Sequence, residues 1–441
     1  MRKIILGLLM LPMMALGQTL EECRQAAEKN YPLIRQYGLI EKTTALTVSN
    51  IQKGWLPQVS ASAQVTYQSD VVAWPDEMRG MMGQMGLNFE GLKKDQYKVG
   101  LDVQQTVFDG GIIKSQKEIA RKQGEVQTAQ HEVNMYQVRK RVNEMYFGLL
   151  LIDEQIVLNK DLQELLAQNE KKLASMVKGG TAAESDYQSV KAERLKVIQQ
   201  ATSLQAQYKA LVRMLSAFCG LTPNPSPIGE GSSYFHPVKP STELYTPLSN
   251  RRGAGGEAAR PELRAIDAQL RLTDAQEKAL NAGLMPKLGV FAQGFYGYPG
   301  YNMFEDMMSR KFSWNGMIGA RLTWNIGALY TRKNDRAKLN VQRSMFNVKR
   351  ETFLFNNYLE QIQQNENIER YKKLMADDDE IISLRSSIRK AAESKLAHGI
   401  IDVNDLVKEI NNENAAKVQQ KVHEIEMLKE IYDQKFTLGE Q

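Results

Sequence analysis

The residue types that catalyse reactions or bind metal ions are sparse and scattered in this 441-residue chain. Its four histidines are His131, His236, His398 and His423, and no two of them have the short spacing of a zinc site. The glycines of KGGTAAESD (178–186) lack the spacing of a phosphate-binding loop, and no nucleophile elbow occurs. The sequence therefore predicts a protein that is not an enzyme and that needs no cofactor or metal.

The two cysteines, Cys23 and Cys219, are the remaining pair that could react with each other. The N-terminus, MRKIILGLLMLPMMALGQ, has two basic residues, a short apolar run and a small-x-small site, which predicts a signal peptide at residues 1–17. Disulfides persist in the oxidising bacterial periplasm, so a bridge is conceivable. Two unrelated buried thiols explain the cysteines equally well, and the sequence leaves the question open.

Lysine and arginine are spread along the chain among glutamate and glutamine rather than grouped in blocks. The formal net charge is +6, and loss of Arg2 and Lys3 with the signal peptide lowers it to +4. This mild and even distribution indicates solvated helix faces rather than a nucleic-acid-binding surface.

The stretch PQVSASAQVTYQ (57–68) alternates between apolar and polar residues, which is the pattern of a strand with one face of each kind. Three further segments read as strands, and each has about the 9 to 11 residues that a strand needs to cross the hydrocarbon core of a membrane. We therefore expect lipid to cover the apolar face. The predicted strands are Val59–Tyr67, Tyr97–Phe108, Leu288–Tyr296 and Trp314–Trp324.

Aromatic residues collect at the ends of these segments, as they do in the aromatic girdles of membrane barrels. Four strands cannot close a barrel, and an open sheet edge is not tolerated in hydrocarbon because its amide groups would be unsatisfied. The chain must therefore share its barrel with other chains, and a ring of three copies would give about twelve strands. The predicted girdle residues are Tyr67, Phe108, Tyr296, Trp314 and Trp324.

The chain contains two similar halves. NYPLIRQ followed by GWLPQVSASAQVTY corresponds to ARPELRA followed by GLMPKLGVFAQGFY, with the same spacing between the prolines. We divide the mature chain into a first repeat (18–218), an insert (219–260) and a second repeat (261–441). The insert is rich in Pro, Gly and Ser, and it either wraps the outside of the molecule as an equatorial segment or acts as a flexible linker.

Each half continues after its second strand into a long helical segment. Residues 111–178 carry apolar residues in steps of three and four, the period of a coiled coil, over a length on the order of 100 Å. Both long helices are predicted to end at glycine turns, after which Thr181 with Glu184 reads as a capping box and Asp402 as a helix cap. The other predicted helices are 25–54, 182–217, 262–285 and 402–437.

The order and duplication of these segments, together with ARPEL (259–263) and VFDGG (107–111), resemble the TolC family of outer-membrane efflux channels. The resemblance covers essentially the whole mature chain. It implies a mainly helical homotrimer with a shared twelve-stranded β-barrel in the lipid of the cell outer membrane and a coiled-coil, α-helical tunnel in the periplasm. It also implies that substrates leave the cell through this channel, as the exit of a tripartite efflux or secretion system with a periplasmic adaptor (membrane fusion protein) and an inner-membrane pump.

Family members have a gate at the periplasmic tip, where acidic residues follow the two inter-helix turns. By motif match these residues are Asp186 and Asp405, each six positions after a turn glycine, although an acid in the first turn of a helix is also favoured by the helix dipole. The chain has Lys408, Leu396 and Ile401 where the best-known member has another Asp, a Tyr and an Arg, so other contacts must hold a closed tip. The resemblance also implies that the turns dock an adaptor, through Gly179, Gly180, Thr181, Gly399 and Ile400.

The main alternative is an outer-membrane-anchored coiled-coil stalk or adhesin that conducts nothing. A solid trimeric coiled coil needs two apolar positions per heptad, whereas NNYLEQIQQNENIERY (356–371) is loaded with Asn, Gln and Glu. This polar run favours a tunnel. The sequence does not identify the cargo, because a duct has no substrate pocket. It also does not identify the class of pump or the resting state of the gate.

Overall fold

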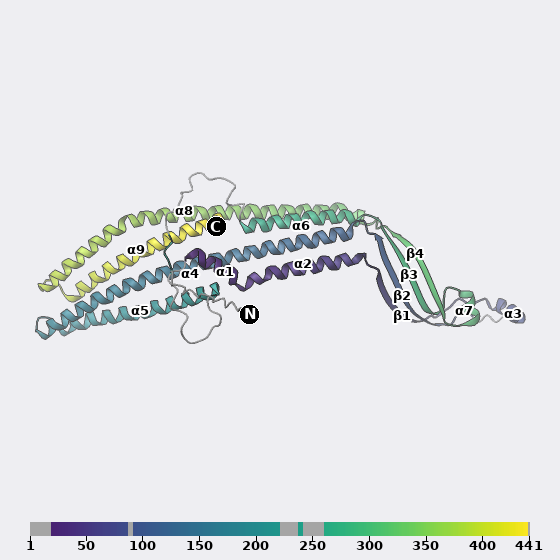
Figure 1. The fold of residues 1–441 in the computed structure, drawn as a ribbon, viewed down its shortest axis with the longest axis horizontal. Coiled ribbons are helices and arrows are strands. Elements are labelled where there is room, and N and C mark those ends of the chain that lie inside the picture. Colours follow the sequence, from purple (N-terminus) through teal and green to yellow (C-terminus); the bar gives the residue numbers. More distant parts are fainter. Residues whose placement is uncertain (1–18, 87–90, 221–236, 241–259, 440–441) are drawn as a thin grey trace, which may run out of the picture. The chain divides into compact units, whose positions relative to one another are not determined.

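The computed structural model describes residues 19–86, 91–220, 237–240 and 260–439. The predicted signal peptide (1–17) and most of the predicted insert (219–260) lie outside these residues. The described part consists of helices and one four-stranded sheet (Figure 1). This confirms the predicted class of mainly α structure with four strands.

The chain forms two compact units, and each unit draws on both halves of the sequence. The helical unit comprises residues 1–37, 129–265 and 350–441, and the sheet unit comprises residues 38–128 and 266–349. The division of the sequence into two repeats and an insert stays a prediction. None of the described helices is both long enough and apolar enough to cross a lipid bilayer.

The sheet unit is built on strands β1 (Gln58–Tyr67), β2 (Asp95–Phe108), β3 (Lys287–Tyr298) and β4 (Ser313–Thr323). All neighbours are antiparallel, and the order in the sheet is β1-β2-β3-β4. The predicted strands are therefore confirmed, with ends that shift by one or two residues and with Trp324 just after β4. Short helices α3 (Asp76–Gln84) and α7 (Met303–Ser309) lie in the loops between β1 and β2 and between β3 and β4.

Four helical segments complete the sheet unit: α2 (Gln36–Gln52), α6 (Pro261–Gly283) and the first parts of α4 (Ile112–Lys178) and α8 (Ala328–Ala397). Ion pairs join neighbouring helices, since Arg271 of α6 pairs with Glu125 of α4 and Arg343 of α8 pairs with Glu277 of α6. Gly124 of α4 lies so close to Thr44 of α2 that a Cβ on the glycine would be 2.5 Å from the threonine hydroxyl oxygen.

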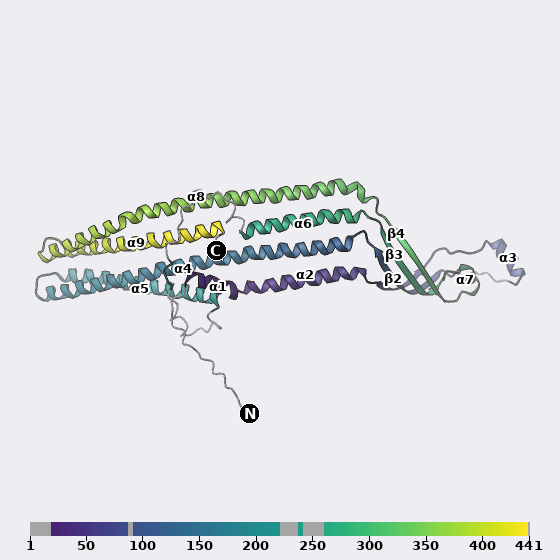
Figure 2. The same cartoon turned by 45° about the horizontal axis from the view of Figure 1, so that its top comes forward.

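The helical unit contains α1 (Leu20–Asn30), α5 (Glu184–Cys219), α9 (Val403–Leu438) and the later parts of α4 and α8. Figures 1 and 2 both show α5 beside α4 and α9 beside α8. A main apolar core joins α1, α4, α5 and α9 through residues such as Val142, Leu149, Val212 and Leu428, all of them buried.

The prediction of one helix over residues 25–54 is wrong. The chain forms α1, a 3₁₀ turn η1 (Pro32–Arg35), α2 and a second 3₁₀ turn η2 (Lys53–Trp55) instead. The break follows from Pro32, because proline lacks an N–H donor and disfavours the helical conformation of the residue before it. Tyr31 is accordingly extended, with φ −61° and ψ 130°.

Val238 and Arg260, two described residues of the predicted insert, are held to helices of the helical unit by hydrogen bonds. The hydroxyl of Tyr146 donates to the carbonyl oxygen of Val238 at 2.7 Å and accepts from its N–H at 2.9 Å. The buried guanidinium of Arg260 donates to the carbonyl oxygens of Phe436 and Thr437, which lie in the last turn of α9. Arg260 thus satisfies backbone acceptors that the end of a helix leaves open.

Candidate functional site

The strand register gathers the apolar residues of the alternating pattern on one face of the sheet. One row across the four strands is Ala63, Val99, Tyr296 and Trp314. A second row is Val59, Val103, Ala292 and Ile318. Among the described residues, little covers this face away from the loop ends of the strands: 82% of Trp314 and 84% of Ile318 are exposed. A continuous apolar face of this size on a protein marks a surface that meets lipid or another protein.

The opposite face is polar, apart from Phe291 and Phe295 of β3 and Met317 of β4. The guanidinium of Arg321 lies 5.1 Å from the Phe291 ring centre, and the ammonium of Lys98 lies 5.1 Å from that of Phe295. Gly319 pairs with Phe291 across the ladder, and its missing side chain leaves room for the ring, because a Cβ there would lie 2.8 Å from the ring. Cations therefore cover the two rings, and this face of the sheet is hydrophilic.

The five predicted girdle residues lie at the two ends of the strands. Tyr67, Tyr296 and Trp314 lie at the ends that carry the loops with α3 and α7, and the rings of Tyr296 and Trp314 are 5.2 Å apart. Phe108 and Trp324 lie at the opposite ends, next to the helices. A bulge after Thr106 places Phe108 opposite Leu288, so Phe108 stays on the apolar face. Their contact with a lipid interface remains a prediction.

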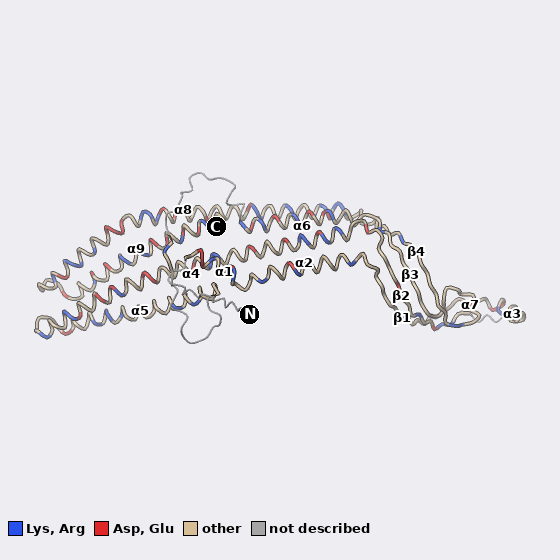
Figure 3. The backbone as a smooth tube through the Cα atoms, in the orientation of Figure 1, with Lys and Arg blue, Asp and Glu red and all other residues tan. Residues whose placement is uncertain are grey.

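The distribution of charge separates the strands from the helices. Figure 3 shows that Lys, Arg, Asp and Glu line the helices, whereas the strands carry few of them. Those few are on the polar face or at strand ends, as with Lys98, Asp102 and Arg321. An uncharged outer face and a hydrophilic inner face are what a strand in a membrane barrel with an aqueous interior requires.

The two turns at the far ends of the long helices have the same backbone hydrogen bonds. In the first tip, between α4 and α5, the N–H of Thr181 donates to the carbonyl oxygen of Met176. In the second tip, between α8 and α9, the N–H of Ile400 donates to that of Lys395. Gly180 and Gly399 have φ of +75° and +69°, as the Schellman motif needs at this position.

The cap of α5 differs from the sequence prediction. Thr181 does not form a capping box with Glu184, because its hydroxyl donates back to the carbonyl oxygen of Met176 at 3.1 Å. Helix α5 begins at Glu184, and the carboxylate of Asp186 accepts from the N–H of Ala183 at 3.3 Å. The prediction for α9 is confirmed, since the Asp402 carboxylate accepts from the N–H of Asp405 at 2.9 Å.

Asp186 and Asp405, the predicted gate acids, occupy equivalent positions in the first turns of α5 and α9. Asp186 is half-buried and binds the backbone of Ala183, whereas the side chain of Asp405 is exposed. The structure therefore gives Asp186 a capping role and leaves the carboxylate of Asp405 facing solvent. Whether they ring a tunnel depends on the assembly, so the gate stays a proposal.

Sequence reasoning missed two Arg–Glu ion pairs behind the tips. Glu170 of α4 pairs with Arg194 of α5, and Arg389 of α8 pairs with Glu413 of α9. Glu170 and Arg389 each lie ten residues before the turn glycine, and Arg194 and Glu413 each lie fourteen residues after it. The two hairpins therefore carry the same bridge with its charges exchanged, a signal that aligning the two repeats would have revealed.

The second of these bridges is the more buried, and it extends into a cluster. Arg389 also pairs with Glu393, and Lys417 pairs with Glu413 at 2.8 Å. Burial disfavours the charged form of Glu413, but hydrogen bonds from Lys417 and Arg389 outweigh that effect and hold the pKa of its carboxyl below the ordinary value. The bridge thus keeps a buried carboxylate ionised between α8 and α9.

An apolar cluster joins the two hairpins near the tips. It contains Leu166 and Leu173 of α4, Val190 of α5 and Leu406 and Ile410 of α9, all of them buried. Leu396 and Ile401, which flank the second turn glycine, pack against this same cluster. Apolar packing therefore joins the two hairpins of one chain near their turns.

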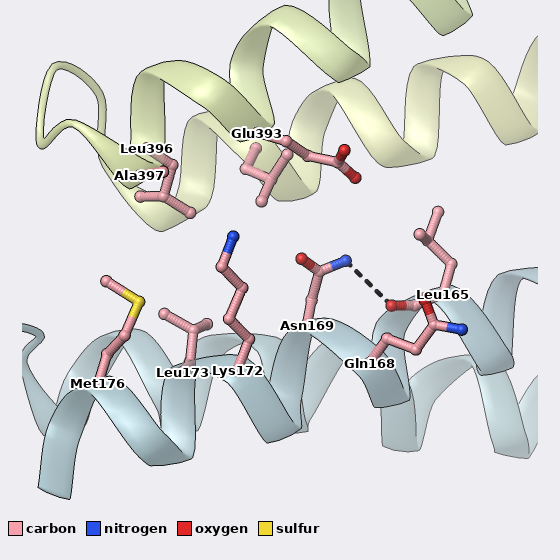
Figure 4. A pocket seen from close by; sticks show the side chains of 10 residues that line it. Leu165, Gln168, Asn169, Lys172, Leu173, Met176, Glu393, Leu396 and Ala397 are labelled. Atoms are coloured by element: carbon pink, nitrogen blue, oxygen red, sulfur yellow. Dashed lines mark hydrogen bonds between the residues drawn. The ribbon is translucent and has the colours of Figure 1, made fainter.

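A pocket of about 200 Å³ opens beside this cluster, between α4 and the second hairpin (Figure 4). Polar and apolar side chains share its walls, and the ammonium of Lys172 points from α4 toward α8, near Leu396 and Ala397. Glu393 and Asn169 add polar groups to the rim. The pocket offers a mixed apolar and basic groove close to both turns.

Helix α8 leaves apolar residues exposed along its length, and α9 packs along its later part. These residues recur in steps of three, four and seven from 341 to 362, and in steps of three and four from 381 to 388, as in a coiled coil, which indicates that another helix covers them. The polar run 356–371 is only partly directed to solvent, because Gln364 donates to Thr437 and Asn367 to Glu430 of α9. The exposed stripe consists of Val341, Met345, Val348, Phe355, Leu359, Ile362, Ile381, Leu384 and Ile388.

No protein-family model matches the sequence, and no curated protein matches it. Solved structures match over almost the whole chain. The outer-membrane channel OprN is 14% identical with a TM-score of 0.66, and the alignment covers 96% of this chain and 90% of that one. The CmeC outer membrane channel of Campylobacter jejuni is 14% identical with a TM-score of 0.67, over 95% and 85% of the two chains.

A third match is CusC, which forms a transmembrane channel. It is 10% identical with a TM-score of 0.69, over 97% of this chain and 93% of CusC. Identities this low carry the fold alone. The chain therefore has the fold of the TolC-family outer-membrane channels, as the resemblance seen in its sequence predicted.

Proposed function

We propose that this chain is one of three subunits of a channel in the cell outer membrane, through which substrates leave a tripartite efflux or secretion system. The observation that carries the proposal is the sheet, which has one largely apolar and exposed face and one hydrophilic face. Within the described residues, β1 and β4 each have a strand neighbour on one side only. Lipid can cover the apolar face, but both edges then need partners because hydrocarbon offers no hydrogen bonds.

A ring of three copies supplies those partners. The free edge of β4 in one subunit would pair with the free edge of β1 in the next, which gives about twelve strands in a closed barrel. The exposed heptad stripe of α8 supports the same assembly, since a helix of a neighbouring subunit can cover it. Residues such as Phe355, Leu359 and Ile362 would then be buried between subunits.

The proposed duct carries out no reaction on its cargo. The hydrophilic face of the sheet would line the barrel, so that substrate passes through water. The OprN, CmeC and CusC folds belong to channels, which supports a channel rather than an enzyme. The energy for export would come from an inner-membrane pump, coupled through a periplasmic adaptor.

Asp186 and Asp405 are proposed to form the constriction at the periplasmic tip. Each chain contributes both, so a trimer would place six carboxylates near one another. Rings of acidic side chains favour the entry and binding of cations. Opening would move the tip helices apart against the apolar cluster of Leu173, Leu406 and Ile410.

The turns are proposed to dock the helical hairpin of an adaptor. Ile400 supports this, because 70% of this apolar side chain is exposed at the end of a turn. The pocket beside Lys172 and Leu396 would receive an adjoining apolar residue of the partner. An Ile400→Asp variant should conduct ions normally as a purified protein and yet fail to support export in cells. Normal export by this variant would remove the second turn from the docking surface.

Single-channel conductance in planar bilayers tests the proposed channel and its gate. We compare the purified protein with a variant that combines Asp186→Ala and Asp405→Ala. The unmodified protein should have a small, cation-selective conductance that divalent cations block. The double variant should lose that selectivity and block because the acidic ring is gone.

Glu184→Ala is the matched control, since it removes the same charge from the same helical turn as Asp186. A control that loses selectivity as fully as the double variant would assign the effect to net charge rather than to the gate. Unchanged behaviour of the double variant would move the gate elsewhere and leave the duct intact. Absence of conductance in every variant, including variants that weaken the packing between the tip helices, would favour the non-conducting stalk.

A further inference from the structure

Two cysteines that are distant in sequence meet in the main core of the helical unit. Cys23 lies in α1 and is 1% exposed, and Cys219 is the last residue of α5 and is 2% exposed. Their side chains form a hydrogen bond with each other, and the Sγ of Cys219 is 3.5 Å from the carbonyl oxygen of Cys23. The two sulfurs are not bonded in the structure. The proposed channel function uses neither residue.

Three contacts around the cysteines hold α1 in a fixed position against the end of α5. The side-chain amide of Asn30 donates to the carbonyl oxygen of Cys219 at 2.7 Å. The rings of Tyr31 and Phe218 stack at 5.3 Å, with 12° between their planes. Gly220 follows with φ +69°, and a Cβ there would lie 2.6 Å from Asn30. Because these contacts do not involve sulfur, they would hold the two cysteines side by side whether or not the sulfurs are bonded.

Burial keeps both thiols out of reach of an oxidoreductase once the protein has folded, since Cys23 and Cys219 are almost completely covered. The hydrogen bond to Cys219 and burial raise the pKa of Cys23, so this thiol stays protonated. Only the thiolate takes part in disulfide exchange. Any oxidation must therefore take place during folding, after α1 has met α5 and before the core closes over the sulfurs.

We propose that Cys23 and Cys219 form a disulfide bond in the exported protein and thereby fasten α1 to the end of α5. This inference rests on the proposed location, because disulfides persist in the periplasm and are rare in the reducing cytosol. The bond would close a loop that contains β1, β2, α4 and α5. Closing so long a loop reduces the freedom of the unfolded chain and raises stability.

The oxidant would be the disulfide of a periplasmic thiol–disulfide oxidoreductase. The thiolate of one cysteine attacks this disulfide, forms a mixed disulfide and expels one thiolate of the oxidoreductase. The second cysteine then attacks its partner's sulfur in the mixed disulfide and expels the other thiolate. The two protons lost by Cys23 and Cys219 go to the two sulfurs of the oxidoreductase, which takes up the two electrons.

Thiol counting on the exported protein tests the bond. The chain is produced with its own N-terminus, recovered from the membrane fraction, denatured without reductant and treated with a maleimide. We expect no labelled cysteine before reduction and two after it, with the unreduced chain lighter by the mass of two hydrogen atoms. Two labelled cysteines without reduction, in protein recovered from the outer membrane, would overturn the proposal.

Cys23→Ala and Cys219→Ala are the controls, and each should give one labelled cysteine whether or not reductant is added. Thermal unfolding supplies a second measurement that does not depend on labelling. Reductant during unfolding should lower the Tm of the unmodified protein by several degrees and should leave the Tm of the double alanine variant unchanged. If reductant left the Tm of both proteins unchanged, a stabilising bond would be contradicted.

Failure of the proposed location can be told apart from failure of the bond. A chain found only in the cytosol would refute the outer-membrane assignment. The same chain, refolded with oxidised glutathione, then tests the geometry alone. An intramolecular disulfide in that sample supports the pair, and two free thiols after complete refolding refute it.

Discussion

The two tips of the helical unit have one backbone design and different side chains. Both turns use a glycine at positive φ and the same hydrogen bonds, at Gly180 and Gly399. The bridge behind each turn has opposite polarity, with the acid on α4 in the first hairpin and on α9 in the second. The caps differ too, since Asp402 caps α9 by itself whereas Ala183 relies on Asp186.

The differences between the two tips show which structural features a tip needs and which can vary. Charge complementarity between two helices can be met in either direction, so the acid and the base are free to exchange places. A cap can come from the residue before the helix or from its first turn. The glycine at positive φ after each helix is harder to replace, because a Cβ is unfavourable in that conformation whatever surrounds it.

Reversing one charge in the second bridge should produce the largest effect. Arg389→Glu would place a carboxylate against the buried Glu413, and breaking a buried pair in this way costs about 3 kcal/mol. The combined exchange Arg389→Glu with Glu413→Arg gives the second hairpin the polarity of the first and should recover part of that loss, because the exchanged charges would also face Glu393 and Lys417. Chemical denaturation of the purified protein in detergent measures both. A double variant as unstable as the single one would show that the hairpins are not interchangeable.

The first bridge supplies the matched comparison for this experiment. Arg194 and Glu170 are more exposed than Arg389 and Glu413, with 31% and 14% of their side chains accessible against 14% and 6%. Glu170→Arg should therefore cost less than Arg389→Glu, because solvent screens the repulsion. An equal cost in both hairpins would mean that burial does not set the strength of the bridge.

Substitution of the turn glycines should have an intermediate and equal effect. Gly180→Ala and Gly399→Ala should each lower the free energy of unfolding by about 1 kcal/mol, since L residues are strained at positive φ. Nothing lies within 4 Å of the site where a Cβ would be added at either position, so crowding cannot separate them. Asparagine should restore part of the loss at both sites. If the two substitutions lowered stability by different amounts in thermal unfolding, one tip would have a contact that the other lacks. An adaptor or a neighbouring subunit could make such a contact.

The caps should produce the smallest effect, and an asymmetric one. Asp402→Ala removes the acceptor for the N–H of Asp405 and should cost about 1 kcal/mol. Ala183→Asp supplies at the first tip the cap that the second already has, and it should stabilise by up to about 0.5 kcal/mol since Asp186 already satisfies one donor. Hydrogen exchange of the first turns of α5 and α9 reports these changes locally. Destabilisation by Ala183→Asp would show that Asp186 has a second contact that the new acid disturbs.

Local patterns predicted much of the fold. The alternation in β1 and the glycine turns each depend on neighbouring residues alone, and both were predicted correctly. The break at Pro32 could have been predicted by the same reasoning, because a proline within a helical segment marks a boundary. The cap of α5 was assigned to Thr181 because the spacing fits a capping box, but the turn uses that hydroxyl to bind Met176.

Other features depend on contacts that local patterns do not contain. Phe291 and Phe295 interrupt the polar face of the sheet, and only the register places Arg321 and Lys98 over them. The contact between Cys23 and Cys219 depends on how α1 docks after the break at Pro32. The pocket at Lys172 likewise requires two hairpins to meet. Such sites follow from tertiary packing and need the structure.

The guanidinium of Arg260 has a consequence for how the chain resists proteolysis. Its acceptors are the carbonyl oxygens of Phe436 and Thr437, almost the last residues that the structure describes. The guanidinium also pairs with Glu262, but without the last turn of α9 its Nη1 group lacks both of its acceptors and the ring of Phe436 cannot pack against it. Loss of that turn would therefore leave N–H groups of a buried side chain without hydrogen bonds. Arg260 thus ties the segment before α6 to the end of α9, so that copies lacking this turn would be more open to proteolysis.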